Sequence, residues 1–300
     1  MQSEKFKSGY VSLTGRPNVG KSTLLNTILG EKIAIVSPKP QTTRNRIVGV
    51  KTMPGAQIIF IDTPGIHKPR HKLGELMVRE AQESSREVDL ILFMVEPEEP
   101  GGGDRFIVEL LKGLQKDVFL LINKVDIVKR PQVLPVIEAY SKLYPFKEII
   151  PVSALTGDGM DILLEKIVEH LPEGPKYYPD DIVTDQMERF MVAEIIREKV
   201  MQQTEEEIPY SVAVEIIQWT EREPESGDGA IVIHANIYVE RKGQRGIIIG
   251  KGGSKLKAIG TSARLEIQKL LGTKVFLELW IKVKRDWRSN ENILRELGFK

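Results

Sequence analysis

Hydrophobic residues in the first half of the chain form short continuous runs separated by stretches with helical spacing. The runs occupy residues 9–15, 56–65, 89–96, 117–126 and 147–155. Helices are expected to begin at Lys21 and near Met160. Continuous apolar runs that alternate with helices are typical of a parallel sheet covered on both faces. We therefore predict an α/β domain with a mostly parallel sheet over residues 1–171.

The pattern changes in the second half of the chain. Helical spacing appears at residues 185–203, and residues 209–221 and 229–241 alternate like two strands. Residues 246–271 fit two further helices, and 273–287 fit a last strand. This order of helix, strand, strand, helix, helix, strand is that of an α+β type II KH domain. We predict this domain over residues 181–300, after a linker rich in proline and glycine at 172–180.

Composition limits the function classes. The 300 residues carry a net charge of +1 and no cysteine, which excludes disulfides and thiolate chemistry. No signal-peptide pattern is present, and no run approaches the roughly 18 apolar residues needed to span a bilayer. A cytoplasmic protein is expected. No coiled-coil heptads occur, so a monomer is expected.

The charge is unevenly distributed along the chain. Residues 180–228 contain 14 acidic and 4 basic side chains, whereas residues 240–288 contain 4 acidic and 13 basic ones. A basic block of this size is either a solvated surface or a face that binds a polyanion.

The stretch from Gly15 to Ser22 satisfies G-x-x-x-x-G-K-[ST] between a predicted strand and a predicted helix. Its glycines let backbone N–H groups point at phosphates, Lys21 can reach the terminal phosphates, and the Ser22 hydroxyl can ligate Mg²⁺. A nucleoside triphosphate is therefore the expected ligand. The residues predicted to hold it here are Gly15, Arg16, Pro17, Asn18, Val19, Gly20, Lys21, Ser22 and Thr23.

Two later strand ends supply the rest of the predicted nucleotide site. Asp62 is placed to hold Mg²⁺ through water, and the Gly65 N–H to bond a γ-phosphate. An aspartate in "NKVD" can accept both N1–H and N2–H of guanine, which makes the nucleotide GTP or GDP. Ala154 in "VSAL" is expected to donate its N–H to the guanine O6. The predicted contacts are Asp62, Thr63, Pro64, Gly65, Ile66, Asn123, Lys124, Asp126, Ser153, Ala154 and Leu155.

These elements, in this order, resemble the translation-factor-related GTPases. The resemblance implies that a threonine in "PQTTRNR" completes the Mg²⁺ shell in the GTP state. Thr43 is favoured over Thr42 because it directly precedes Arg44, as in related bacterial GTPases. The metal ligands are then Ser22, Thr43 and Asp62, and the catalytic group comprises Lys21, Thr43 and Gly65.

The residue after "DTPG" departs from the Ras pattern. Ile66 stands where Ras-like enzymes carry a glutamine that orients the attacking water, so slow intrinsic hydrolysis is expected. Relatives with asparagine at the position of Asn18 suggest the hypothesis that K⁺ supplies the missing charge. His67 and His71 are candidate bases, but in a basic loop we expect both to be solvated.

Gly250-Lys251-Gly252-Gly253 matches the G-x-x-G loop with which KH domains clamp about four unstacked nucleotides. The apolar stretch from Gly246 is expected to form one wall of the groove and the strand within 231–239 the other. Trp287 could stack on a base, or pack against the terminal strand. The predicted RNA contacts are Gly246, Ile249, Gly250, Lys251, Gly252, Gly253, Ser254, Lys255 and Lys257.

A GTPase domain followed by a type II KH domain resembles the bacterial Era GTPases over essentially the whole chain. The resemblance implies binding to the 3′ end of 16S ribosomal RNA and a role in assembly of the small ribosomal subunit. It also suggests peripheral contact with the inner face of the cell membrane. The alternative is a signalling switch whose effector is a protein or the membrane, with the KH-like domain as its binding module.

Overall fold

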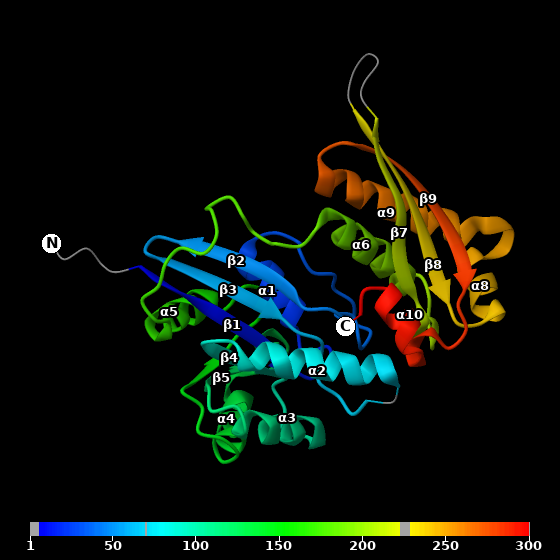
Figure 1. The fold of residues 1–300 in the computed structure, drawn as a ribbon. Coiled ribbons are helices and arrows are strands. Elements are labelled where there is room, and N and C mark those ends of the chain that lie inside the picture. Colours follow the sequence, from blue (N-terminus) through cyan, green and yellow to red (C-terminus); the bar gives the residue numbers. More distant parts are fainter. Residues whose placement is uncertain (1–5, 70, 223–228, 300) are drawn as a thin grey trace. The chain divides into compact units, whose positions relative to one another are not determined.

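The computed structural model describes residues 6–69, 71–222 and 229–299. These fall into two compact units, one within residues up to Asp185 and one from Gln186 onward, with Ser37–Lys39 and His71–Leu73 grouped with the second. Figure 1 shows the elements of both units. Within the described ranges, no helix is both long and apolar enough to cross a membrane.

The first unit is an α/β fold whose six-stranded sheet has the order β2-β3-β1-β4-β5-β6. All neighbouring strands are parallel except β2 and β3, which form an antiparallel hairpin. This confirms the predicted mostly parallel sheet. The elements are β1 (Lys7–Gly15), α1 (Lys21–Leu29), β2 (Ile47–Met53), β3 (Ala56–Asp62), α2 (Lys72–Arg86), β4 (Leu90–Val95), α3 (Gly102–Lys112), β5 (Asp117–Ile122), α4 (Val133–Ser141), β6 (Glu148–Pro151) and α5 (Met160–His170).

The parallel register gathers the candidate nucleotide residues at one edge of the sheet. Leu13 of β1 lies opposite Asp62 at the end of β3, and Gly15 lies opposite Met94 of β4. β5 ends at Ile122, opposite Pro151 of β6. Since the carboxyl ends of parallel strands meet at the same edge, the loops that follow β1, β3, β5 and β6 lie together there.

The segment predicted as a linker is hydrogen-bonded to the first unit. The Ser8 N–H donates to the Pro172 carbonyl (3.1 Å), and the Val50 N–H of the edge strand β2 donates to the Val183 carbonyl (2.7 Å). The Thr184 hydroxyl donates to the Val48 carbonyl at 2.6 Å. Residues 172–184 therefore run along the sheet and cover part of the β2 edge.

Gln57 holds this segment from inside the sheet. Its side chain is fully buried. Its Oε1 accepts from the N–H groups of Tyr177 (2.9 Å) and Tyr178 (3.0 Å), and its Nε2 donates to the Tyr178 carbonyl (2.9 Å). One amide side chain thus satisfies three backbone groups of the segment.

The second unit has the predicted type II KH order. Its sheet has the order β7-β8-β9, with β7 antiparallel and β9 parallel to β8. Apolar side chains of α6 and α9 pack with those of the strands to form its core. The elements are α6 (Glu188–Gln202), α7 (Ile208–Ser211), β7 (Ala213–Arg222), β8 (Ala230–Val239), α8 (Lys242–Ile249), α9 (Ser254–Leu271), β9 (Lys274–Val283) and α10 (Glu291–Glu296).

Trp287 belongs to the core of the second unit. β9 ends at Val283, earlier than predicted, and Trp287 follows in a short 3₁₀ turn. The indole is fully buried, its Nε1–H donates to the Ser211 carbonyl at 2.9 Å, and its ring stacks with Phe299. Of the two predicted roles, packing is the one observed.

Replacing Gln57 with Leu should destabilise the first unit by about 1–3 kcal/mol, because backbone groups of Tyr177 and Tyr178 lose their buried partner. Urea unfolding followed by far-ultraviolet circular dichroism would measure the change, since all three tryptophans lie in the second unit and would not report on the first. Gln202→Leu, at an exposed position of α6, is the matched control. Equal stability of the two variants would contradict the role given to Gln57.

Candidate functional site

The loop between β1 and α1 depends on glycine at two positions. A Cβ atom on Gly15 would lie 2.5 Å from the Met94 carbonyl oxygen, and one on Gly20 would lie 2.2 Å from the Asn123 Nδ2. Gly20 also has φ of 107°, in the left-handed region that favours glycine. Any other residue at either position would push the loop away from the strand ends that carry the rest of the site.

Lys21 begins α1 and is buried. Its Nζ donates to the carbonyls of Gly15 (3.3 Å) and Arg16 (3.0 Å). Burial lowers the pKa of Lys21 to about 8, and the charge of Asp62 acts against this shift. The loop therefore holds a desolvated cation at its opening, where a phosphate would offer it a stronger partner.

The three predicted metal ligands lie together. The Ser22 hydroxyl donates to Asp62 Oδ2 at 2.6 Å and lies 2.9 Å from the Thr43 hydroxyl, which is 3.4 Å from the same carboxylate oxygen. Thr43 therefore lies where the predicted metal ligand is needed, and its choice over Thr42 stays a prediction.

The donor set fits Mg²⁺. Asp62 Oδ1 is buried without a hydrogen-bond partner in the described part of the chain. Oxygen donors from two hydroxyls and one carboxylate are the kind that Mg²⁺ takes beside nucleotide phosphates. The described residues contain no group of three or more acidic or histidine side chains placed to hold a metal ion, and Mg²⁺ held beside a nucleotide does not require one.

Asp62 is buried at a cost. Burial raises the pKa of Asp62 to about 6, although Lys21 and the hydroxyls of Ser22 and Thr43 act in the opposite direction. Burial removes water from the carboxylate, and this loss of solvation leaves Oδ1 without a hydrogen-bond partner among the described residues and raises the pKa.

The segment after Asp62 lies against the phosphate loop. The Ile66 N–H donates to the Gly15 carbonyl at 3.0 Å, and a Cβ on Gly65 would lie 2.7 Å from backbone atoms of Pro17. Thr63 is fixed below by a hydrogen bond from its hydroxyl to the Leu13 carbonyl (2.7 Å). The Ile66 side chain is buried in the core formed with α2 and α3. It therefore belongs to the core of the first unit.

The expectation that His67 is solvated is wrong. Its ring is half-buried, Nδ1 donates to the Gly65 carbonyl at 3.0 Å, and Nε2 lies 3.0 Å from the Gln41 amide nitrogen. The ring thus connects the segment around Thr43 to the segment after Asp62.

Asn123 connects three loops of the candidate base site. Its Nδ2 donates to the Val19 carbonyl (2.7 Å) and its Oδ1 accepts the Ala154 N–H (2.8 Å). Asp126 is exposed, and its Oδ1 accepts the Ser153 hydroxyl at 2.6 Å, which orients the carboxylate. Because the Ala154 N–H already has this partner, its predicted bond to the guanine O6 would require a shared, three-centre hydrogen bond.

The remaining predicted nucleotide residues are spread around the loops. The Arg16 guanidinium forms ion pairs with Glu98 (2.6 Å) and Asp104 (2.9 Å), two acidic residues near the start of α3. Its side chain is therefore held by these carboxylates. Lys124 forms an ion pair with Glu96. Asn18 is exposed with φ of 66°, and Leu155 is exposed.

The predicted RNA loop lies between α8 and α9. Gly250, Gly252 and Gly253 have φ of 71°, 59° and 79°. A Cβ on Gly252 would meet nothing within 4 Å, so this backbone is open to approach by a ligand. Lys251 and Lys257 are exposed, and Lys255 packs beside Gly250.

A groove of about 810 Å³ extends between α8 and β9. Gly246 and Ile249 line it as predicted. The opposite wall is β9, and the prediction of the strand within 231–239 is wrong: β8 is the central strand, paired on both sides, and the strand residues that line the groove belong to the edge strand β9. The residues that sequence analysis missed are Lys242, Arg245, Ile281, Lys282 and Val283.

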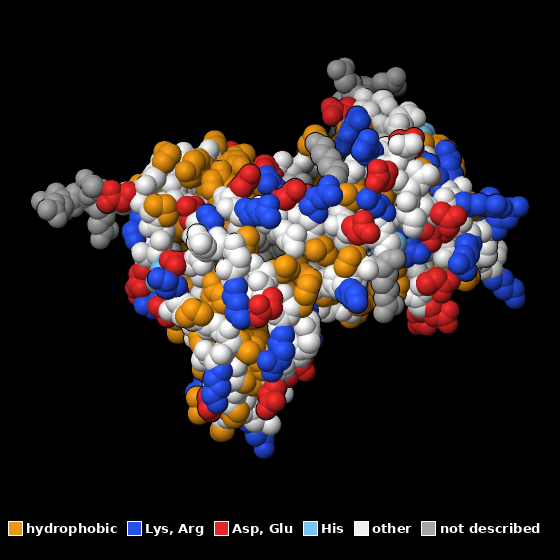
Figure 2. Space-filling model, turned by 60° about the horizontal axis from the view of Figure 1, so that its bottom comes forward, with side chains coloured by type: hydrophobic (Ala, Val, Ile, Leu, Met, Phe, Trp, Pro, Cys, Tyr) orange, Lys and Arg blue, Asp and Glu red, His pale blue; other side chains and the backbone are white. Residues whose placement is uncertain are grey.

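Acidic and basic side chains are interspersed on the face shown in Figure 2. Several ion pairs are local to one unit, such as Lys199 with Glu198 at 2.9 Å and Lys284 with Glu296 at 2.7 Å. Part of the charge asymmetry in the sequence is therefore neutralised in place. The basic residues that line the groove and could contact a polyanion are Lys242, Arg245 and Lys282.

Comparison with known proteins identifies the family of each unit. Residues 10–124 match the family described as "50S ribosome-binding GTPase", and residues 207–288 match the KH domain family. GTPase Era of Geobacter metallireducens is 57% identical over 301 residues, covering 100% of both chains. The chain belongs to the Era GTPase family. GTPase Era of Ruminiclostridium cellulolyticum is 55% identical, covering 98% of both chains.

Solved Era structures share the fold of this family member. Era in complex with MgGDPNP and nucleotides 1506–1542 of 16S ribosomal RNA gives a TM-score of 0.94 at 46% identity, covering 98% of this chain and 99% of that one. A variant of Aquifex aeolicus Era bound to GDP·AlF₄⁻ gives the same values.

The buried Asp62 predicts a pH dependence of stability in the nucleotide-free protein. The folded state holds the Asp62 proton more tightly, with a pKa of about 6 against an ordinary 3.8. Stability should therefore fall as pH rises from about 4 to about 6, by at most about 3 kcal/mol. Asp62→Asn should remove this decline and raise the stability of nucleotide-free protein at neutral pH, while abolishing Mg²⁺-dependent nucleotide binding.

Urea unfolding between about pH 4.5 and pH 7.5 would test this. Asp126→Asn, which replaces an exposed carboxylate, is the control. Parallel pH profiles for wild type and Asp62→Asn would show that the buried carboxylate is not the source.

Proposed function

We propose that this chain is a GTP-hydrolysing switch that binds single-stranded RNA at the 3′ end of 16S ribosomal RNA and acts in assembly of the small ribosomal subunit. The observation that carries the proposal is the presence in one chain of a guanine-nucleotide site and a basic G-x-x-G groove. A related Era crystallised with MgGDPNP and nucleotides 1506–1542 of that RNA supports the identity of both ligands.

The nucleotide site acts through this chain's own groups. Backbone N–H groups of the loop from Gly15 to Gly20 hold the phosphates, and Lys21 binds the terminal ones. Ser22, Thr43 and, through water, Asp62 would hold Mg²⁺, and the bound ion would supply positive charge to the transferred phosphoryl group. The Gly65 N–H donates to the γ-phosphate. Asp126, oriented by Ser153, selects guanine.

Hydrolysis is slow without assistance. Ile66 has no polar group to orient the attacking water, and its side chain is buried in the core. His67 donates its Nδ1–H to a carbonyl, and its Nε2 faces the Gln41 amide, so it is not poised as a base in this arrangement. A K⁺ ion held at the exposed Asn18 would supply positive charge beside the phosphates.

GTP binding couples to RNA binding through the segments around Thr43 and after Gly65. Both segments gain partners from the γ-phosphate and Mg²⁺, and both relax after hydrolysis. The His67 hydrogen bonds connect them, so they respond together. We propose that this transition repositions the KH domain so that its groove is open to RNA in the GTP state.

We also propose where the protein acts and in which oligomeric state. The basic residues of the second unit would allow weak peripheral contact with the anionic inner face of the cell membrane. The protein acts in the cytoplasm as a monomer. The competing function is a switch whose effector is a protein or the membrane, and it differs in requiring no RNA specificity of the groove.

The groove predicts the effect of reversing charge at its loop. Lys251→Asp combined with Gly252→Asp should abolish binding to 16S 3′-end RNA while leaving GTP affinity within about twofold, because both positions are exposed and belong to the second unit. Crosslinking and sequencing of co-purified RNA, with protein loaded with a non-hydrolysable GTP analogue, would measure this. Ser141→Asp combined with Lys142→Asp, which makes the same change of net charge at two adjacent exposed positions at the end of α4, is the charge-matched control.

A single protected segment near the 16S 3′ end, lost in the double variant and kept in the control, is the expected result. Diffuse RNA that is unchanged in the double variant would favour the competing function.

The K⁺ hypothesis predicts a difference between alkali ions. GTP hydrolysis in K⁺ buffer should exceed that in Na⁺ buffer by on the order of 10-fold, because one added charge near the γ-phosphate stabilises the transition state. Asn18→Ala should remove the difference without changing the rate in Na⁺. Phosphate release measured in both buffers would decide, and equal rates for wild type would refute the role of K⁺.

A further inference from the structure

The outer face of β9 carries exposed aromatic and basic side chains that the groove between α8 and β9 does not account for; this groove ends at Ile249, next to Gly250-Lys251-Gly252-Gly253, and is called the GKGG groove below. Along β9, residues alternate between the core, where Val275 and Ile281 are buried, and the opposite face. On that face Phe276 is 48% exposed and Trp280 is 38% exposed. Large aromatic rings at such exposure on an edge strand are available to a ligand.

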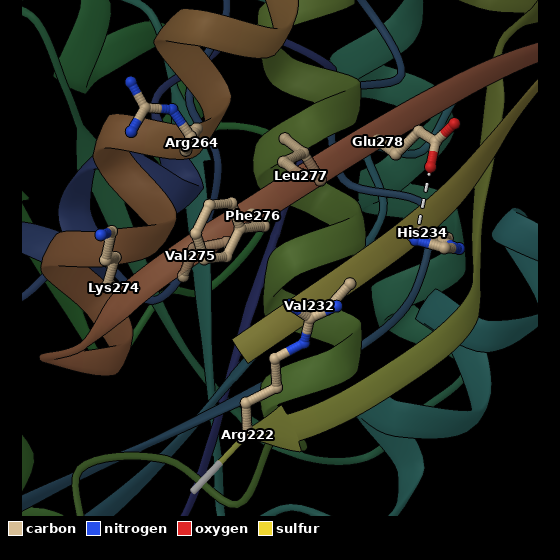
Figure 3. A pocket seen from close by; sticks show the side chains of 9 residues that line it. All are labelled: Arg222, Val232, His234, Arg264, Lys274, Val275, Phe276, Leu277 and Glu278. Atoms are coloured by element: carbon tan, nitrogen blue, oxygen red, sulfur yellow. Dashed lines mark ion pairs between the residues drawn. The ribbon is translucent and has the colours of Figure 1, made fainter. Parts of the chain in front are cut away.

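Phe276 lies in a pocket of about 480 Å³ at the start of β9, entirely within the second unit. Figure 3 shows its side chains arriving from three strands and from α9. Arg222 ends β7, Val232 and His234 come from β8, and Arg264 comes from α9. The full lining is Arg222, Val232, His234, Arg264, Lys274, Val275, Phe276, Leu277 and Glu278.

The pocket combines the two kinds of group that bind single-stranded nucleic acid, which are positive charges and an aromatic ring. Arg222, Arg264 and Lys274 provide positive charge for phosphates. Lys274 Nζ lies 5.4 Å from the centroid of the Phe276 ring, so a cation and a stacking surface adjoin. Base stacking on an aromatic ring tolerates any base, because every base has a π-face.

One acidic residue, Glu278, lines the pocket with these cations. Its carboxylate is 3.4 Å from His234 Nε2, and the His234 ring meets Trp280 edge to face at 5.1 Å. A carboxylate fixed in this way would repel a phosphate but can accept a hydrogen bond from the amino group of a base. The pocket is therefore better suited to a nucleotide with its base inward than to a free anion.

The pocket and the GKGG groove share one strand. The groove is lined by Ile281, Lys282 and Val283 at the end of β9, and the pocket by residues 274–278 at its beginning. Lys274 and Lys282 are separated by roughly 26 Å along the strand, at about 3.3 Å per residue. Their side chains, with Phe276, Glu278 and Trp280 between them, share one face because strand side chains alternate.

We propose that the pocket around Phe276 is a second subsite for single-stranded RNA, reached by the strand that occupies the GKGG groove. The inference rests on the proposed function. A KH groove takes about four nucleotides, and the proposed RNA is longer, so the flanking nucleotides need further surface. Phe276 stacks on a base, Arg264 and Lys274 bind phosphates, and Glu278 accepts from a base amino group.

The test compares two RNA lengths on the full chain loaded with GDPNP and Mg²⁺. One labelled RNA is nucleotides 1506–1542 of 16S ribosomal RNA, and the other is a segment of about six nucleotides selected from it for binding the GKGG groove. Phe276→Ala should weaken binding of the long RNA by roughly 10-fold, and Arg264→Gln combined with Lys274→Gln by at least as much. Both should bind the short RNA within about twofold of wild type.

Three controls keep the outcomes distinct. Unchanged binding of the short RNA shows that the variants are folded, and Phe276→Tyr should restore affinity for the long RNA because it keeps a ring. If wild type binds neither RNA, the proposed function itself fails. If wild type binds both and the variants bind the long RNA equally well, only the second subsite is refuted. Variants that bind free RNA normally but lose association with small ribosomal subunits would mean that the face docks a protein.

Discussion

The nucleotide site depends on how closely the loop between β1 and α1 approaches the end of β5. A Cβ atom on Gly20 would lie 2.2 Å from the Asn123 amide nitrogen, so no side chain fits there. That amide holds the Val19 carbonyl on one side and the Ala154 N–H on the other. Phosphate loop and base loops are therefore fixed relative to one another by one side chain, and only a glycine leaves room for it. The parallel sheet provides the shared edge, and this contact fixes the spacing along it.

Two buried charges favour binding of a nucleotide and lower the stability of the nucleotide-free protein. Lys21 and Asp62 both have pKa values shifted toward their neutral forms, and burial is the main cause for each. A phosphate and a divalent cation would offer each of them the opposite charge. The interactions that the sheet leaves incomplete are thus those that a bound nucleotide completes, as expected where a local rule is broken for function.

The sequence was sufficient for features that are local in the chain. Gly15 and Asp62 end strands β1 and β3, and "NKVD" directly follows β5, so recognising each strand places these residues. Features that depend on pairing over long separations were missed. β2 and the segment ending at Thr184 meet across more than a hundred residues, and no periodicity in either marks the partner.

The groove shows the same limit. The order of elements along the chain was predicted, but which strands lie at the edges of the sheet is a property of pairing, and the edge strand β9 rather than the central strand β8 lines the groove. Lys242 and Arg245 could have been found, because they precede Ile249 at helical spacing on α8. His67 could not have been placed, since its partner Gln41 lies 26 residues away in an irregular segment.

The hydrogen bonds from β2 to Val183 and Thr184 bear on where this chain can be divided. β2 is an edge strand, and an unpaired edge is a template for association between molecules. A fragment that stopped at residue 171 would retain every nucleotide motif yet leave that edge bare, whereas one that stopped at Asp185 would keep it covered. The last nucleotide motif and the predicted domain end lie before residue 172, but the chain that covers the sheet edge continues to Thr184. The stretch of about a dozen residues between these points protects the first unit from self-association through β2.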